Sequence, residues 1–312
     1  MKTRPFQQVD VFTDQPYFGN PLAVVLDGQG LDDAAMQRFA RWTNLSETTF
    51  LLPPHNPAAD YRVRIFTPDR ELDFAGHPTL GSCHSWLLAG GAPRSPEFIV
   101  QECRVGLVKI RPEPMAAGRQ RLAFAAPPLK RSAPGPAVLA QIAAALGLKA
   151  SQIIAAQVLD NGLTWHALLL DNPDTVLQIT PDYPALGKLK VYVGVAGMYP
   201  RDGQPQLIAR ASREAQAFGG QTPAHAELAP EPDLEVRAFV GADSGFEDPV
   251  TGGLNASLAQ WLIADKHAPE RYLASQGVCL GRAGQVHIER DASGQVWVGG
   301  ESVSCIAGQV TL

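Results

Sequence analysis

Two stretches of this sequence, one in each half, carry the same ordered pattern of residues. Each runs from a strand-like segment through an acidic turn and a glycine-containing corner into an apolar helix. The copies span residues 62–89 and 235–264, and they align Asp73 with Asp248, Ser82 with Ser257, and Trp86 with Trp261. An ordered set of matches indicates an internal duplication. We therefore expect two similar domains that face each other, with a site between them.

The helices that close the two copies, residues 78–89 and 253–264, are apolar or small almost all round, which is typical of a buried helix. Each follows a glycine corner, Gly76-His77-Pro78 in the first copy and Gly252-Gly253 in the second. A buried helix N-terminus leaves backbone N–H groups without partners, and the helix dipole favours an anion there. Two such ends at a domain interface would form a carboxylate pocket. The alternative is that side chains of their own cap both ends.

The length of 312 residues, 45% of them hydrophobic, accommodates two ordinary domains. We predict an N-terminal domain over residues 1–125 and a C-terminal domain over residues 126–312, with the option that the final strand packs back on the first domain. The stretch 112–136, rich in Pro, Arg and Ala, is a candidate linker. Residues 218–233 have the composition of an irregular loop.

The charge pattern limits the partners of the protein. A formal net charge of −5 with scattered basic residues argues against nucleic acid or an acidic membrane surface. No apolar stretch reaches the length of a membrane span and no signal-peptide core follows the first charges, so the expected location is the cytoplasm. The seven histidines show no paired metal-binding spacing, and no glycine-rich nucleotide loop occurs, so we expect no metal and no cofactor.

Three titratable residues are candidates for chemistry. Glu47 opens a strand-like segment among apolar neighbours, where desolvation would raise its pKa toward that of a general base; the alternative is a solvated strand-edge carboxylate. His77 stands at the first corner, where the helix dipole makes it a neutral donor or proton carrier, unless it simply caps its turn. Asp248, at the second corner, is first of all a helix cap, and a cap that faces the pocket can also bind or protonate a substrate.

Six short motifs occur in a fixed order along the chain. They are Gln8-Val-Asp-Val-Phe12, Gly19-Asn20-Pro21-Leu-Ala-Val24, Ser46-Glu47-Thr48, Phe74-Ala-Gly-His-Pro-Thr-Leu80, Glu247-Asp-Pro-Val-Thr-Gly252, and Gln276-Gly277 with Gly281-Arg282. In this combination the chain resembles the PhzF-like family of phenazine-biosynthesis isomerases, from near residue 6 to near residue 310.

The resemblance implies an α+β fold of the diaminopimelate-epimerase type, with two similar pseudo-symmetric domains, each a mixed barrel-like sheet around a central helix. It also implies a homodimer that isomerises trans-2,3-dihydro-3-hydroxyanthranilate without a cofactor. The catalytic residues of the family fall on Glu47, His77 and Asp248. The backbone positions that hold the substrate carboxylate fall on Gly76, Gly252 and Gly253. Asn20 and Ser46, which stand in two of the motifs, are predicted to bind the substrate as well.

Two departures refine the predicted function. Gly253 stands where the phenazine enzymes have Ser, so a substrate-facing hydroxyl is missing and activity on the phenazine precursor is left open. Two-base epimerases of this fold place a cysteine at each corner, and the matching Ala75 and Pro249 cannot hold a proton. We therefore predict a cofactor-independent isomerase that moves a proton on a small carboxylate substrate with Glu47 as acid and base. The alternatives are an amino-acid racemase or epimerase of the same fold, and a non-catalytic small-molecule binding protein.

Overall fold

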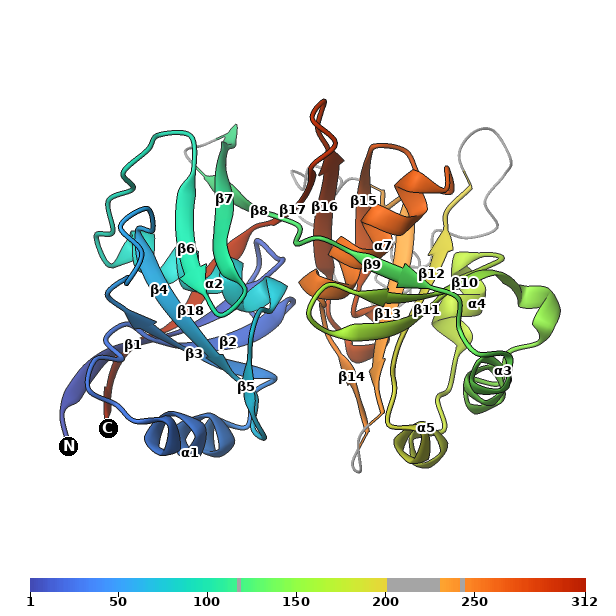
Figure 1. The fold of residues 1–312 in the computed structure, drawn as a ribbon, viewed down its shortest axis with the longest axis horizontal. Helices are drawn as coiled ribbons and strands as arrows, with labels where there is room; N and C mark the ends of the chain where they lie inside the picture. The colour runs from blue at the N-terminus through green and yellow to red at the C-terminus, as the bar shows by residue number, and fades with distance from the viewer. Residues whose placement is uncertain (117–118, 201–230, 242–244) are drawn as a thin grey trace, which may run out of the picture.

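A computed structural model gives the fold and describes residues 1–116, 119–200, 231–241 and 245–312 (Figure 1). The first half contains β1 (Thr3–Val11), β2 (Asn20–Val25), α1 (Asp33–Thr43), β3 (Glu47–Leu52), β4 (Tyr61–Phe66), β5 (Glu71–Leu72), α2 (Gly76–Leu88), β6 (Ile99–Cys103), β7 (Gly106–Pro114) and β8 (Gln120–Ala125). The second half contains β9 (Lys130–Ser132), α3 (Pro136–Ala145), β10 (Ile153–Asp160), β11 (Thr164–Leu170), α4 (Pro173–Gln178), α5 (Tyr183–Leu189), β12 (Tyr192–Met198), β13 (Leu234–Val240), β14 (Phe246–Asp248), α7 (Gly252–Ala264), β15 (Arg271–Gln276), β16 (Gly284–Arg290), β17 (Val296–Gly300) and β18 (Ser302–Thr311).

The strands of the two halves pair in the same order and in the same directions. The first half runs from β8 through β7, β6, β4, β3 and β2 to β1. The second runs from β17 through β16, β15, β13, β12 and β11 to β10. In both runs the third and fifth pairs are parallel and the others are antiparallel. The duplication seen in the sequence is therefore repeated in the sheet.

Each run is completed by a strand from beyond its own segment of chain. The last strand, β18, lies antiparallel to β1, with Thr311 opposite Thr3 and Ser302 opposite Val11. In the second half β9 takes the same place beside β10. The pairing of β8 with β17 joins the two sheets, and the termini lie side by side in Figure 1. The domain boundary at residue 125 remains a prediction.

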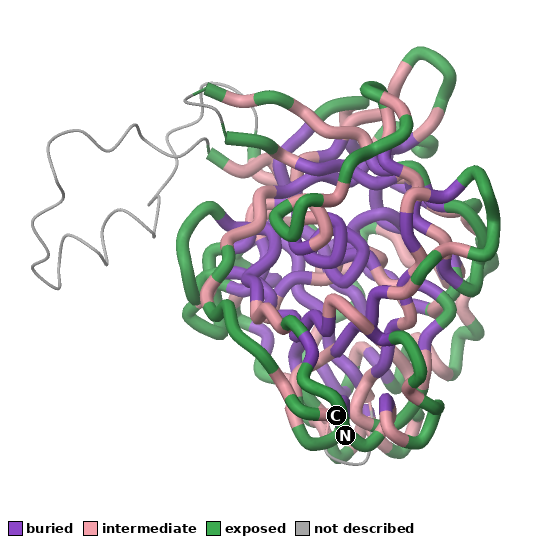
Figure 2. Tube along the Cα trace, turned by 90° about the vertical axis from the view of Figure 1, so that its left-hand side faces the viewer, coloured by how far each residue is buried: buried purple, intermediate pink, exposed green. Residues whose placement is uncertain are grey.

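Two helices occupy the interior of the molecule, α2 in the first half and α7 in the second. The helix α2 packs against β1, β2, β3 and β8, and α7 packs against β16, β17 and β10. Most of their residues are buried because almost every position is apolar or small, as Figure 2 shows for the centre of the trace. These buried helices inside curved mixed sheets confirm the predicted α+β fold with two similar halves.

The predicted connections are less accurate than the predicted fold. The stretch 112–136 is not simply a linker, because β7 reaches Pro114 and β8 and β9 both lie within it. The loop predicted at 218–233 lies outside the described residues except for 231–233.

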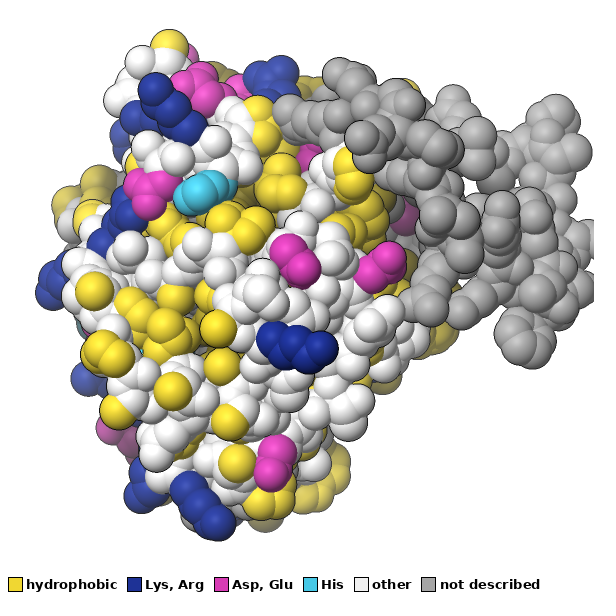
Figure 3. All heavy atoms as spheres, turned by 90° about the vertical axis from the view of Figure 1, so that its right-hand side faces the viewer, with side chains coloured by type: hydrophobic (Ala, Val, Ile, Leu, Met, Phe, Trp, Pro, Cys, Tyr) yellow, Lys and Arg dark blue, Asp and Glu magenta, His cyan; other side chains and the backbone are white. Residues whose placement is uncertain are grey.

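The described residues contain no helix long and apolar enough to cross a membrane. On the face shown in Figure 3, Lys and Arg side chains are dispersed among acidic and apolar ones and form no single basic patch. The expectation that the protein does not bind nucleic acid or a membrane remains a prediction.

Candidate active site

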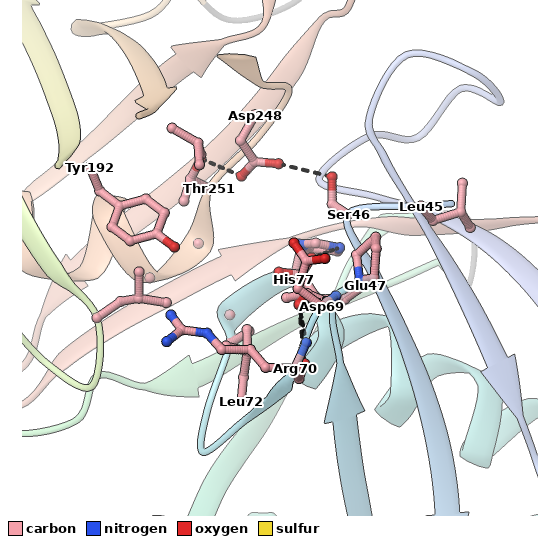
Figure 4. Close-up of a pocket in the computed structure, with 18 of the residues that line it drawn as sticks. Leu45, Ser46, Glu47, Asp69, Arg70, Leu72, His77, Tyr192, Asp248 and Thr251 are labelled. Carbon is pink, nitrogen blue, oxygen red and sulfur yellow. Dashed lines mark hydrogen bonds and ion pairs between the residues drawn. The ribbon is translucent and has the colours of Figure 1, made fainter. Parts of the chain in front are cut away.

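A cavity of about 640 Å³ lies between the two halves, where α2 and α7 begin. Its lining includes the residues before β3, the β4–β5 turn and the start of α2 on one side, and residues of β11, β12, β14 and α7 on the other. Figure 4 shows that His77, Glu47, Ser46 and Asp248 come together in this cavity from both halves. The predicted residues that line it are Ser46, Glu47, Gly76, His77, Asp248, Gly252 and Gly253.

The two helix starts touch through their backbones. A methyl group added to Gly76 would lie only 2.7 Å from the carbonyl carbon of Gly252, so the approach requires glycine at Gly76. Neither helix start has a side-chain cap, which removes the alternative raised by the sequence. Because the first N–H groups of a helix have no partner within it, two sets of donors converge at this end of the cavity. This arrangement suits a carboxylate.

Glu47 lies at the first position of β3, where the chain enters the sheet after α1. The helix ends at Asn44 in the left-handed conformation (φ 55°), and Glu47 pairs with Leu22 of β2. Its side chain is 15% exposed, so its carboxylate can reach a ligand. Burial, and then the charge of Asp248, raise the pKa of Glu47 well above its ordinary value of 4.5.

His77 faces Glu47 from the start of α2. Its Nε2 atom lies 3.3 Å from Oε2 of Glu47, and its Nδ1 atom lies 3.3 Å from the amide nitrogen of Asn20. The two N–H groups of this amide also face Oδ1 of Asp248 and the carbonyl oxygen of Val250, each at 2.9 Å, so the contact with Nδ1 does not assign the ring proton. Nε2 of His77 and Oε2 of Glu47 are both buried, and neither has a hydrogen-bond partner among the described residues. Burial lowers the pKa of His77 to about 3, which keeps the imidazole neutral.

Asp248 enters the site from β14 and is held by hydroxyl and amide donors. Its Oδ2 accepts a hydrogen bond from Thr251 at 2.6 Å, and its Oδ1 accepts from Asn20 at 2.9 Å and from Ser46 at 3.4 Å. Burial raises its pKa from 3.8 to about 6, although these hydrogen bonds act in the opposite direction. Asp248 makes no cap hydrogen bond to α7, so the interpretation of this residue as a helix cap is wrong.

Asn20 does not lie at the surface of the cavity, where the sequence predicted that it contacts the substrate. It is fully buried and does not line the cavity. Its amide nitrogen contacts Asp248 and His77, which belong to different halves. The predicted contact of Asn20 with a substrate is therefore not supported, and Asn20 is a positioning residue that fixes the two side chains relative to each other.

Two further residues of the corner escaped the sequence reasoning. The residue directly before α7, in the position that Ala75 takes before α2, is Thr251 and not Pro249. Thr251 lines the cavity, and Gln276 holds it by accepting from its N–H at 3.0 Å and donating to its hydroxyl at 2.9 Å. Gln276 stands in one of the six sequence motifs, and this position could have identified it as a residue of the site. A threonine hydroxyl is no more able than Pro249 to act as a general base near neutral pH.

Alanine substitutions at the two corners test how close the helix starts must be. Gly76→Ala forces a methyl group against the backbone of Gly252, and we expect a loss of about 1–3 kcal/mol in the free energy of unfolding. We also expect weaker binding of sulfate or benzoate in calorimetric titrations, because the donors move apart. Gly253→Ala is the control, since a methyl group there meets nothing within 4 Å. Equal effects of the two substitutions would contradict the close approach.

Comparison with known proteins assigns the chain to a family. Residues 9–308 match the family model PhzC-PhzF, described as phenazine biosynthesis-like protein. The chain belongs to the PhzC-PhzF family. It is 32% identical to an uncharacterized isomerase from Mesorhizobium japonicum, over 99% of each chain. It is 30% identical to the trans-2,3-dihydro-3-hydroxyanthranilate isomerase of Pseudomonas aeruginosa, over 92% of this chain and 90% of that one.

The PhzC-PhzF assignment extends to solved structures. A predicted epimerase from Pseudomonas aeruginosa has a TM-score of 0.74 at 26% identity, with 99% of each chain covered. These comparisons support an isomerase-type enzyme. Within the described residues, no group of three His, Cys, Asp or Glu side chains is arranged to hold a metal ion.

Proposed function

We propose that this PhzC-PhzF protein is a cofactor-independent isomerase that moves a proton on a small carboxylate substrate, with Glu47 as acid and base. The observation that carries the proposal is the position of the Glu47 carboxylate. It lies in a cavity 3.3 Å from a neutral imidazole and shares that cavity with two uncapped helix starts. A raised pKa makes Glu47 a stronger base once it is ionised, as proton abstraction from carbon requires.

The proposed reaction begins with the substrate carboxylate at the N–H groups of Gly76, Gly252 and Gly253. Glu47 then removes a proton from carbon, and the same N–H groups stabilise the negative charge that develops next to the carboxylate. Glu47 returns the proton to another carbon on the same face. His77, whose neutral imidazole lies 3.3 Å from the Glu47 carboxylate, and Asp248 position the substrate and handle its polar protons.

The substrate of the Pseudomonas aeruginosa relative is not carried over. Gly253 lacks the hydroxyl that the phenazine enzymes present, and the space beside it is open. The one-base mechanism is preferred to racemisation because Ala75 and Thr251, the residues before the two helices, supply no second base of suitable pKa. The homodimer, the cytoplasmic location and the independence from a cofactor remain predictions.

The experiment that tests the proposal is a screen of small cyclic carboxylates and amino acids in heavy water. Loss or shift of a C–H signal in proton NMR identifies a substrate, and the Glu47→Gln variant is run in parallel. Turnover in the parent that disappears in Glu47→Gln supports the proposal. If several compounds bind but none shows a lost or shifted C–H signal, the binding-protein alternative takes its place. Inversion at a single carbon would indicate a racemase or epimerase.

The pH dependence of the reaction should report the raised pKa of Glu47. A protonated Glu47 cannot accept a proton, so kcat/KM is expected to fall as the pH is lowered through that pKa, well above 4.5. In Asp248→Asn the charge that contributes to the shift is absent, so the same limb of the profile should move to lower pH. A profile that stays flat down to pH 4.5, or one that Asp248→Asn leaves in place, would contradict the assignment.

A further inference from the structure

The turn between β4 and β5, residues Thr67 to Arg70, forms one edge of the cavity and is firmly held. Within it, the Thr67 hydroxyl accepts hydrogen bonds from the N–H groups of Asp69 and Arg70 at 3.2 and 3.1 Å. From α1, Gln37 donates to the carbonyl oxygens of Thr67 and Pro68 at 2.8 and 3.0 Å. The backbone of Arg70 is thus fixed relative to the cavity.

The side chain of Arg70, in contrast, has no assigned task within the protein. Its guanidinium makes no hydrogen bond or ion pair with any described residue, and the carboxylates of Glu71 and Asp73 are engaged elsewhere. Glu71 binds Arg64 at 2.7 Å and Arg104 at 3.2 Å, and Asp73 lies 3.3 Å from Arg104. In Figure 4 the Arg70 side chain points toward the side of the cavity where Tyr192 lies. A fixed backbone therefore carries an uncommitted cation at a cavity wall.

The wall opposite this turn is mainly apolar. Leu163, Trp165, Tyr192 and Phe246 line it, and the rings of Trp165 and Tyr192 lie 5.5 Å apart between centroids. The cavity therefore offers backbone N–H donors at the helix starts, an apolar and aromatic side, and guanidinium groups at the β4–β5 turn. These are Arg70 of the turn itself and Arg41 of α1, whose Nε donates to the Pro68 carbonyl at 3.1 Å. A ligand that matches all three has an apolar or ring framework with an anionic group at two separate positions.

We propose that Arg70 determines the substrate class of the enzyme by binding a second carboxylate, so that the substrate is a dicarboxylate. This inference rests on the proposed function, in which the first carboxylate lies at the helix starts. Guanidinium groups bind carboxylates through paired hydrogen bonds, which suits a substrate end that reaches the β4–β5 turn. The alternative at this turn is Asp69, which is exposed beside Arg70. Its carboxylate would favour a substrate that carries an ammonium group at this end instead of a second carboxylate.

The test compares three probes that share one ring: benzoate, isophthalate and terephthalate. Binding is measured by calorimetric titration on the full chain. We expect at least one dicarboxylate to bind about two- to fivefold more tightly than benzoate, the modest range that fits an exposed cation. Arg70→Gln should abolish this preference and leave the affinity for benzoate unchanged. The control is Arg38→Gln, which removes the same charge from an exposed position on α1 that does not line the cavity.

Three outcomes would overturn the inference: neither dicarboxylate binds better than benzoate, the preference survives in Arg70→Gln, or Arg38→Gln removes it equally. Tighter binding of 3-(aminomethyl)benzoate than of either dicarboxylate would assign the turn to Asp69 instead. Because binding is measured without turnover, the inference and the proposed function can fail separately. A dicarboxylate preference that depends on Arg70 supports the inference even if the heavy-water screen finds no proton exchange.

Discussion

Replacing Glu47 by glutamine is expected to lower kcat by about 10²–10⁴-fold, the usual contribution of a general base. Glutamine keeps the shape of the side chain but cannot accept a proton. Binding of a carboxylate ligand should change little, because the helix starts at Gly76 and Gly252 are untouched. The measurement is turnover of whichever carboxylate the heavy-water screen identifies, together with its dissociation constant. Full activity in Glu47→Gln would remove Glu47 from the mechanism.

Stability provides the control for this variant. The pKa of Glu47 is raised in the folded protein, so its ionisation costs folding free energy, and this cost grows as the pH rises through the folded-state pKa. Glutamine cannot ionise. Glu47→Gln should therefore be at least as stable as the parent at alkaline pH, and its advantage should shrink at acid pH. Loss of activity with unchanged or increased stability separates a catalytic role from a structural one.

Replacing Arg237 by methionine is expected to lower the free energy of unfolding by about 3–5 kcal/mol, as for other broken buried ion pairs. Arg237 is 4% exposed and binds Glu247 through two hydrogen bonds of 2.9 and 2.8 Å. It also donates to the carbonyl oxygens of Val176 and Ile179 at the end of α4. Removal of the cation leaves Glu247 as an uncompensated buried charge beside Asp248. Urea unfolding followed by circular dichroism measures the loss.

Two variants sharpen this second prediction. Arg237→Met combined with Glu247→Gln should recover part of the loss, because the isolated charge is gone. Arg271→Met is the matched control, since Arg271 pairs with Glu289 at 2.6 Å but its side chain is 78% exposed. Such exposed pairs contribute about 0–1 kcal/mol. Equal losses in Arg237→Met and Arg271→Met would show that the buried pair has no special role in holding β14.

Sequence reasoning was most accurate where a local pattern determines the structure. The helix starts at Gly76 and Gly252 could be predicted because a buried apolar helix after a glycine corner has few alternatives, and their convergence followed from the repeat. The complete burial of Asn20 could not be predicted. It depends on the packing of β2 against Asp248 and His77, which are far away along the chain. The residue that precedes α7 is Thr251 and not the predicted Pro249 for the same reason. Gln276, which belongs to β15, holds the N–H of Thr251 at the start of this helix.

Arg70 illustrates a different limit. In the sequence it is one of several scattered basic residues, and nothing local separates it from Arg62 or Arg64. Its significance depends on the carboxylates that its neighbours already bind and on the turn that α1 holds in place. A side chain without a partner can be recognised only when the partners of the surrounding residues are known.

The pairing of β18 with β1 has a consequence for synthesis of the protein on the ribosome. The second half has all the strands of its own run, from β9 to β17, before β18 emerges. The strand β1, in contrast, has no partner along one edge until the ten residues of β18 have been synthesised. Until then β1 presents an unpaired edge, which is the kind of surface that invites association with other chains. Nascent chains of this protein should therefore depend on chaperones for the first half more than for the second, although the first half is made earlier.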